Sequence, residues 1–127
     1  MKELTEALRE FTIRYKISGT NILAIPNYEF VNGELINPFL KWAGEYEQIT
    51  PSKARFTYEE VGYEIFFTSA DRWVLDEWVL TSTPDVVKDV KQRLGTRGYY
   101  LVQGRLLNST KQIRVSSLQQ VLQMAGL

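Results

Sequence analysis

The sequence predicts an α+β protein with one compact domain over residues 1–127, a mainly antiparallel sheet built of hairpins, and N-terminal, middle and C-terminal helices. Its length is usual for a single domain, and 44% hydrophobic residues are enough to fill a core. Segments with helical spacing of apolar residues lie between segments in which apolar and polar residues alternate. The pair Asn32-Gly33 lies between two such alternating segments, as expected of a two-residue hairpin turn.

In the N-terminal half, apolar residues recur at helical spacing and predict an amphipathic helix over 2–16. The run Ile22–Ile25, which Pro26 ends, predicts a strand. A proline at the first helical turn predicts a short helix over 38–48, although Gly44 weakens it. Residues 55–80 have a strand-like pattern. Within them WVLDEWVL, residues 73–80, fits a strand or a helix, and its β-like flanks favour the strand.

The C-terminal half contains a clear helix start, in which Ser82-Thr83-Pro84-Asp85 combines a hydroxyl cap, a proline and an acidic first turn. We expect the helix to run from Pro84 to Leu94, with Gly95 as its cap. Its inward face is predicted to consist of Val86, Val90 and Leu94. Beyond it we expect a strand at 99–107, a turn at 108–111, a strand at 112–116, and a last helix at 118–124 that Ser117 caps.

The chain contains no cysteine and no histidine, which removes most catalytic chemistry. Disulfides, thiol nucleophiles, zinc–thiolate sites and Ser-His-Asp triads are excluded. Phosphate-binding glycine loops and serine-elbow motifs are also missing from the sequence. We therefore expect no metal, no cofactor and no enzymatic activity. The acidic pairs Glu59-Glu60 and Asp76-Glu77 leave a carboxylate-dependent hydrolase as a weak alternative, because adjacent strand residues point to opposite faces.

Charge is distributed unevenly although the net charge is zero. Residues 1–77 carry a balance of −5, and residues 78–127 a balance of +5, because only Asp85 and Asp89 are acidic after Glu77. The two halves could neutralise each other in the fold, or the basic half could bind an acidic partner. Both interpretations stay open on the sequence alone.

The stretch LGTRGYYLVQGRL, residues 94–106, is the main candidate for a binding surface. If 99–107 pairs with 112–116, one exposed face presents an aromatic ring, amides and guanidinium groups, with further cations at its ends. Such a set can bind an acidic protein surface, or stack bases and hold phosphates. Trp73 and Trp78 are expected in the core, whereas Trp42 is equally compatible with the core and with a binding surface. The predicted partner-binding residues are Arg97, Tyr99, Gln103, Arg105, Lys111, Arg114 and Trp42.

The sequence thus predicts a small non-catalytic binding protein, an accessory, adaptor or inhibitor protein, whose partner is a protein with an acidic surface. The alternative is a nucleic-acid-binding module that uses the basic C-terminal sheet face. No apolar stretch is long enough to cross a membrane, and the charged start MKELTEALRE lacks the apolar core of a signal peptide, so we expect a cytoplasmic protein. Whether the chain forms a homo-oligomer is left open.

Overall fold

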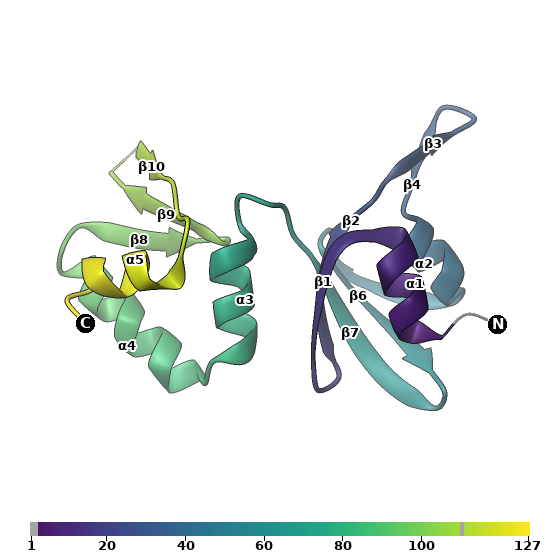
Figure 1. The fold of residues 1–127 in the computed structure, drawn as a ribbon, viewed down its shortest axis with the longest axis horizontal. Helices are drawn as coiled ribbons and strands as arrows, with labels where there is room; N and C mark the ends of the chain where they lie inside the picture. Colours follow the sequence, from purple (N-terminus) through teal and green to yellow (C-terminus); the bar gives the residue numbers. More distant parts are fainter. Residues whose placement is uncertain (1–2, 110) are drawn as a thin grey trace. The chain divides into compact units, whose positions relative to one another are not determined.

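The computed structural model describes residues 3–109 and 111–127 and confirms the α+β class (Figure 1). Helices lie near the N-terminus, in the middle and at the C-terminus, and the sheets are mostly antiparallel. Contacts group the chain into two compact units, unit 1 (Met1–Ser69) and unit 2 (Ala70–Leu127). The single domain over 1–127 stays a prediction, and each unit is described by itself.

Unit 1 contains a five-stranded sheet in the order β1-β2-β7-β6-β5. Its strands are β1 (Thr12–Ser18), β2 (Asn21–Pro26), β5 (Tyr46–Thr50), β6 (Lys53–Tyr58) and β7 (Val61–Phe67). All neighbours are antiparallel except β2 and β7, which pair in parallel from Asn21↔Glu64 to Ala24↔Phe67. The parallel pair joins two antiparallel ribbons, β1-β2 and β5-β6-β7, into one sheet.

Two helices, α1 (Leu4–Phe11) and α2 (Pro38–Ala43), complete the core of unit 1. The side chain of Asn37 accepts hydrogen bonds from the backbone N–H groups of Phe39 and Leu40, which fixes the start of α2. Apolar residues of both helices pack with the inward residues of β2, β6 and β7. The most deeply buried members of this core are Ala7, Leu8, Ile22, Ala24, Phe39, Ala54 and Ile65.

A two-stranded hairpin of β3 (Glu29–Val31) and β4 (Glu34–Ile36) projects from unit 1 (Figure 1). Its turn is the predicted Asn32-Gly33 pair, and both residues have positive φ, 52° and 80°. This left-handed conformation at both central positions is the geometry of a type I′ turn, the two-residue hairpin turn that this pair favours. The two strands form a separate sheet that no third described strand extends.

Unit 2 combines three helices with a three-stranded antiparallel sheet in the order β10-β9-β8. Its elements are α3 (Trp73–Thr81), α4 (Pro84–Gly95), β8 (Tyr99–Val102), β9 (Arg105–Asn108), β10 (Lys111–Ile113) and α5 (Leu118–Met124). Thr83 and Ser117 accept hydrogen bonds from the backbone N–H groups of Val86 and Gln120, as predicted for helix caps. The core consists of Leu75, Trp78, Val87, Val90, Leu94, Leu106, Val121 and Ala125. Among the described residues, no helix is long and apolar enough to span a membrane.

Two predicted helices of unit 1 are shorter than expected. The helix predicted over 2–16 ends at Phe11, and the chain continues as β1, because Thr12–Ser18 pairs with β2. The helix predicted over 38–48 ends at Ala43, since Gly44 has a φ of 80° and Tyr46–Thr50 pairs with β6. In both cases sheet hydrogen bonds outweigh helical periodicity. The predicted positions Lys2 and Thr110 lie outside the described residues.

Residues 73–80 form helix α3, so the strand favoured there is wrong. The N–H groups of Asp76 and Ser82 donate to the carbonyls of Arg72 and Trp78, both at 3.0 Å. The segment thereby satisfies its own backbone and needs no neighbouring strand. Trp73 and Trp78 are buried, as expected.

Four predictions about the C-terminal half also need correction. The strand expected at 99–107 is the hairpin β8-β9, whose turn residues Gln103 and Gly104 have φ of 50° and 75°. The returning strand ends at Ile113 instead of reaching position 116. On α4, Val87 is buried and Val86 is 49% exposed, so the inward face is Val87, Val90 and Leu94. Gly95 is the last residue of α4, and the following turn has positive φ at Gly98.

Candidate functional site

The structure separates the residues that were expected to share one exposed face of the C-terminal sheet. Tyr99 is half-buried and packs against the core of unit 2, whereas Tyr100 is 55% exposed. Gln103 lies in the β8-β9 turn. Lys111 pairs with Asn108, which itself pairs with Tyr99, so Lys111 is on the same face as Tyr99. The predicted set therefore does not form a single face.

The outer face of this sheet has a different composition. Register places Tyr100, Leu107 and Gln112 in one row across the three strands, and the pair Val102↔Arg105 beside it. Directly paired residues project to the same side of a sheet, so these five side chains share the face that points away from the core. An exposed aromatic ring, an amide and a guanidinium group do occur together here, but around Tyr100.

The predicted arginines lie in three different settings. The guanidinium of Arg97 lies against Gly126 near the C-terminal end. Arg105 forms an ion pair with Asp71, with Nε and Oδ2 at 3.4 Å. Arg114 follows β10, and its carbonyl accepts a hydrogen bond from the Gln120 side chain at 2.9 Å. All three side chains are exposed, and exposed ion pairs such as Arg105–Asp71 contribute little to stability.

Trp42 is half-buried at the edge of the unit 1 core. Its ring centroid lies 5.4 Å from that of Phe39 and 5.7 Å from that of Tyr58. It also lines a hollow of about 310 Å³ at the base of the β3-β4 hairpin, together with Phe11, Val31 and Lys41. Trp42 is thus a core residue with one surface open to this hollow.

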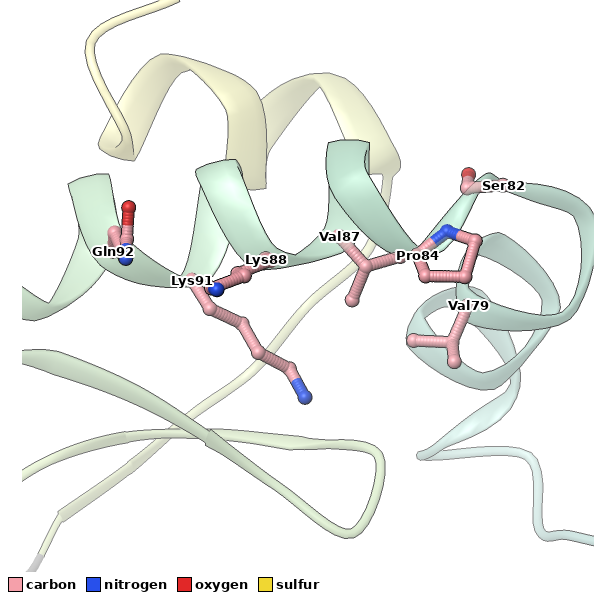
Figure 2. A pocket seen from close by; sticks show the side chains of 7 residues that line it. All are labelled: Val79, Ser82, Pro84, Val87, Lys88, Lys91 and Gln92. Atoms are coloured by element: carbon pink, nitrogen blue, oxygen red, sulfur yellow. The ribbon is translucent and has the colours of Figure 1, made fainter.

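A larger groove of about 590 Å³ lies between α3 and α4 of unit 2 (Figure 2). Val79 of α3 and Pro84 and Val87 of α4 form its apolar part, and the lysines at positions 88 and 91 lie along α4 beside it. The positions 84, 87, 88 and 91 follow the spacing of one helix face, which explains why they line the same groove.

The two lysines of this groove are available to a ligand. Lys88 and Lys91 are exposed, and within the described ranges 3–109 and 111–127 neither forms an ion pair. The nearby carboxylate of Asp89 is already engaged by Arg93, with Nε and Oδ2 at 3.0 Å. An apolar groove with two unpaired cations at its side fits a segment that carries both apolar and acidic side chains.

Each of the two acidic pairs lies within a single segment, one in a turn and one on a helix. Glu59 and Glu60 form the turn between β6 and β7, with φ of 49° and 68°, and both are exposed. Asp76 and Glu77 are neighbours on α3, and a carboxylate oxygen of Glu77 accepts a hydrogen bond from the indole of Trp73 at 2.9 Å. The described part of the chain contains no group of three or more acidic, histidine or cysteine residues that could hold a metal ion.

One charged network on unit 1 does perturb a titrating group. Glu64 accepts a hydrogen bond from Arg55 at 2.8 Å and forms an ion pair with Lys53 at 3.3 Å. The hydrogen bonds from Arg55 and then Lys53 lower the pKa of the Glu64 carboxyl, and the hydrogen bond to Glu64 raises the pKa of Arg55. All three residues come from the adjacent strands β6 and β7, so this network links the two paired strands.

Sequence reasoning missed the groove because the segment around Val79 was interpreted as a strand. The helical spacing of the residues after Pro84 already predicted the wall of the groove that α4 forms. The opposing wall, which includes Val79, exists only because residues 73–81 form a helix.

Comparisons with protein families, with curated proteins and with solved structures gave no match.

Proposed function

We propose that this chain is a small non-catalytic binding protein, an accessory, adaptor or inhibitor protein, that acts through contacts with another protein. The observation that carries the proposal is the α3-α4 groove, in which an apolar floor adjoins the unpaired lysines 88 and 91. The partner is a protein segment with acidic and apolar side chains. Apolar burial supplies affinity at such a site, and charge complementarity supplies orientation and association rate.

The uneven charge of the sequence supports the same partner chemistry. From Trp78 to Leu127 the chain has seven Lys/Arg and two Asp/Glu residues. One of those two acids, Asp89, is paired with Arg93. A partner that approaches this part of unit 2 therefore meets a positive field, which accelerates the encounter of an acidic segment at low ionic strength.

A displayed library of random twelve-residue peptides tests the proposal. Dilute wild-type protein should enrich peptides that combine Asp or Glu with large apolar residues. The variant Lys88→Glu/Lys91→Glu should lose that enrichment, because like charges would face each other at the groove. A matched control, Arg9→Glu/Lys16→Glu, makes the same charge change on unit 1 and should enrich the same peptides as the wild type.

If the peptides enriched by the wild type lack acidic residues, or if the groove variant binds them as well as the control does, the groove is not the binding site. Circular dichroism of each variant checks that a loss of binding is not caused by a loss of fold. We expect the wild-type spectrum for all variants, because the four substituted side chains are exposed.

A nucleic-acid-binding module is the second candidate, and the outer sheet face around Tyr100 favours it. Tyr100 and Gln112 belong to one row across the sheet, and Arg105 lies on the same face. An exposed ring can stack on a base while the guanidinium group contacts a phosphate. A mixed-sequence single-stranded oligonucleotide should then bind in low salt, and Tyr100→Ala/Arg105→Ala should weaken it, while Tyr28→Ala/Arg9→Ala should not.

Salt separates the two candidates. The affinity for a nucleic acid falls steeply as salt rises, in proportion to the number of phosphates that the protein neutralises. If the oligonucleotide fails to bind the wild type even in low salt, the nucleic-acid candidate is refuted and the protein-binding proposal is unaffected.

A further inference from the structure

The β3-β4 hairpin and the residue before it, which we call the arm (residues 28–36), carry Phe30, the most exposed of the large apolar side chains that the structure describes, together with Tyr28, Val31 and Leu35. Phe30 is 77% exposed, Leu35 is 56% exposed and Tyr28 is 48% exposed. Phe30 and Leu35 are direct cross-strand partners, so they form one apolar face of the hairpin. Exposed apolar surface that is concentrated on one element indicates an interaction site.

The arm is also acidic. Residues 17–40 contain Glu29 and Glu34 and no lysine or arginine. Both glutamates are exposed, and both belong to the face of the hairpin opposite Phe30 and Leu35. A partner surface that accepts this arm therefore needs an apolar recess for Phe30 and Leu35 and cations at its rim for the two carboxylates.

The α3-α4 groove has these two properties, and it belongs to the same chain. We propose that the arm of one copy docks in the α3-α4 groove of a second copy. The inference rests on the proposed function, because it names an occupant for the same groove. Val79, Pro84 and Val87 offer apolar contact to Phe30 and Leu35, and Lys88 and Lys91 offer charges to Glu29 and Glu34.

Charge and size favour this pairing over contact between two arms. Two arms that packed through Phe30 and Leu35 would leave Glu29 and Glu34 without a cation to pair with, because residues 17–40 contain no lysine or arginine, whereas the groove supplies two lysines. A groove of about 590 Å³ lies within the range of roughly 300–1,000 Å³ in which proteins bind compact ligands, so large side chains such as Phe30 can enter it. The contact joins different surfaces of the two copies, so it can close into a dimer or continue as an open series.

Sedimentation velocity over a wide range of protein concentration is the first test. The wild type should shift from the monomer mass of 14.7 kDa toward twice that mass or more as concentration rises. Phe30→Ser/Leu35→Ser, the arm variant, and Lys88→Glu/Lys91→Glu, the groove variant, should each raise the dissociation constant at least about tenfold. The control variants Ile13→Ser and Arg9→Glu/Lys16→Glu change exposed residues elsewhere and should associate as the wild type does.

Mixing the two defective variants tests the pairing itself. The arm variant keeps an intact groove and the groove variant keeps an intact arm, so an equimolar mixture should associate although each variant alone does not. To follow one partner in the mixture, a cysteine is added after Leu127 of the arm variant and labelled with a fluorophore. The label attaches at that cysteine alone, because the chain has no other cysteine. The labelled arm variant should sediment faster when the unlabelled groove variant is added.

Each other outcome contradicts the inference. A wild type that is monomeric at every concentration overturns it, and so does association that either variant leaves unchanged. If both variants are monomeric but the mixture does not associate, the arm does not dock in the groove. A monomeric wild type that still enriches acidic, apolar peptides overturns this inference and leaves the proposed function standing, whereas loss of groove-dependent peptide binding overturns the proposed function.

Discussion

Val90 provides the most direct test of how helix α4 packs in unit 2. It is 2% exposed and contributes to the core with Val87 and Leu94. Val90→Asp removes an apolar side chain whose burial stabilises the fold by about 1.5–3 kcal/mol. It also places a carboxyl group in the core without a partner, which costs roughly a further 2 kcal/mol or more. The expected loss in the free energy of unfolding is therefore at least about 3.5 kcal/mol.

That loss is large compared with the stability of a unit of this size. A unit of about 60 residues has roughly 3–9 kcal/mol of stability, so Val90→Asp should leave unit 2 unfolded or close to it. Urea unfolding followed by circular dichroism gives the change in free energy, and amide hydrogen exchange separates the residues of unit 2 from those of unit 1. Exchange protection should fall in unit 2 in particular.

Val86→Asp is the matched control, since it makes the same substitution on the same helix. Val86 is 49% exposed and lies in the first turn, where a carboxylate interacts favourably with the helix dipole. The variant should remain within about 0.5 kcal/mol of the wild type. The reasoning is refuted if the two variants unfold at similar urea concentrations, or if Val86→Asp is the less stable of the two.

Gly104 and Glu64 provide two further tests of the structure. Gly104 has a φ of 75°, and a Cβ there would lie 2.6 Å from Oδ1 of Asp76 and 3.0 Å from Cβ of Arg72, whereas Gly33 has a φ of 80° and open space around it. Gly104→Ala should therefore cost at least about 1 kcal/mol more than Gly33→Ala in thermal unfolding, and equal costs would contradict the close approach. The ion pairs of Glu64 lower the pKa of its carboxyl in the folded state. Their contribution to the free energy of unfolding is therefore present above the pKa of 4.5 in the unfolded chain, and it is lost as pH falls through the lower pKa of the folded state. Wild type should therefore exceed Glu64→Gln in stability at neutral pH and lose this advantage in acid, and a constant difference over that pH range would contradict the assignment.

Local turn and cap chemistry could be predicted from short stretches of sequence. Asn32-Gly33 specified its turn because the left-handed conformation is least costly for these residue types. Thr83 and Ser117 specified the starts of α4 and α5, because a hydroxyl oxygen can accept from the free N–H groups of a first turn. The same sequence predicted the buried tryptophans 73 and 78 from their apolar surroundings.

The composition also limited the candidate site before any fold was considered. The lack of histidine and cysteine excludes whole classes of chemistry, since no arrangement of the remaining residues can restore an imidazole or a thiolate. The basic excess after Glu77 led us to expect an acidic partner at the C-terminal half, and the α3-α4 groove, where we propose that a partner binds, lies in that half.

Only the tertiary structure decided which face of each element is covered. A single turn at Gln103-Gly104 makes two strands of the segment 99–107 and places Tyr100, not Tyr99, on the outer face. The apolar residues of 73–80 fit both the helical and the strand spacing. Because the segment folds as helix α3, it forms one wall of the groove. Val86 and Val87 are adjacent and chemically identical, so nothing within the helix itself distinguishes the buried valine from the exposed one. Burial is a property of the neighbours that pack against a side chain, and those neighbours come from distant parts of the sequence.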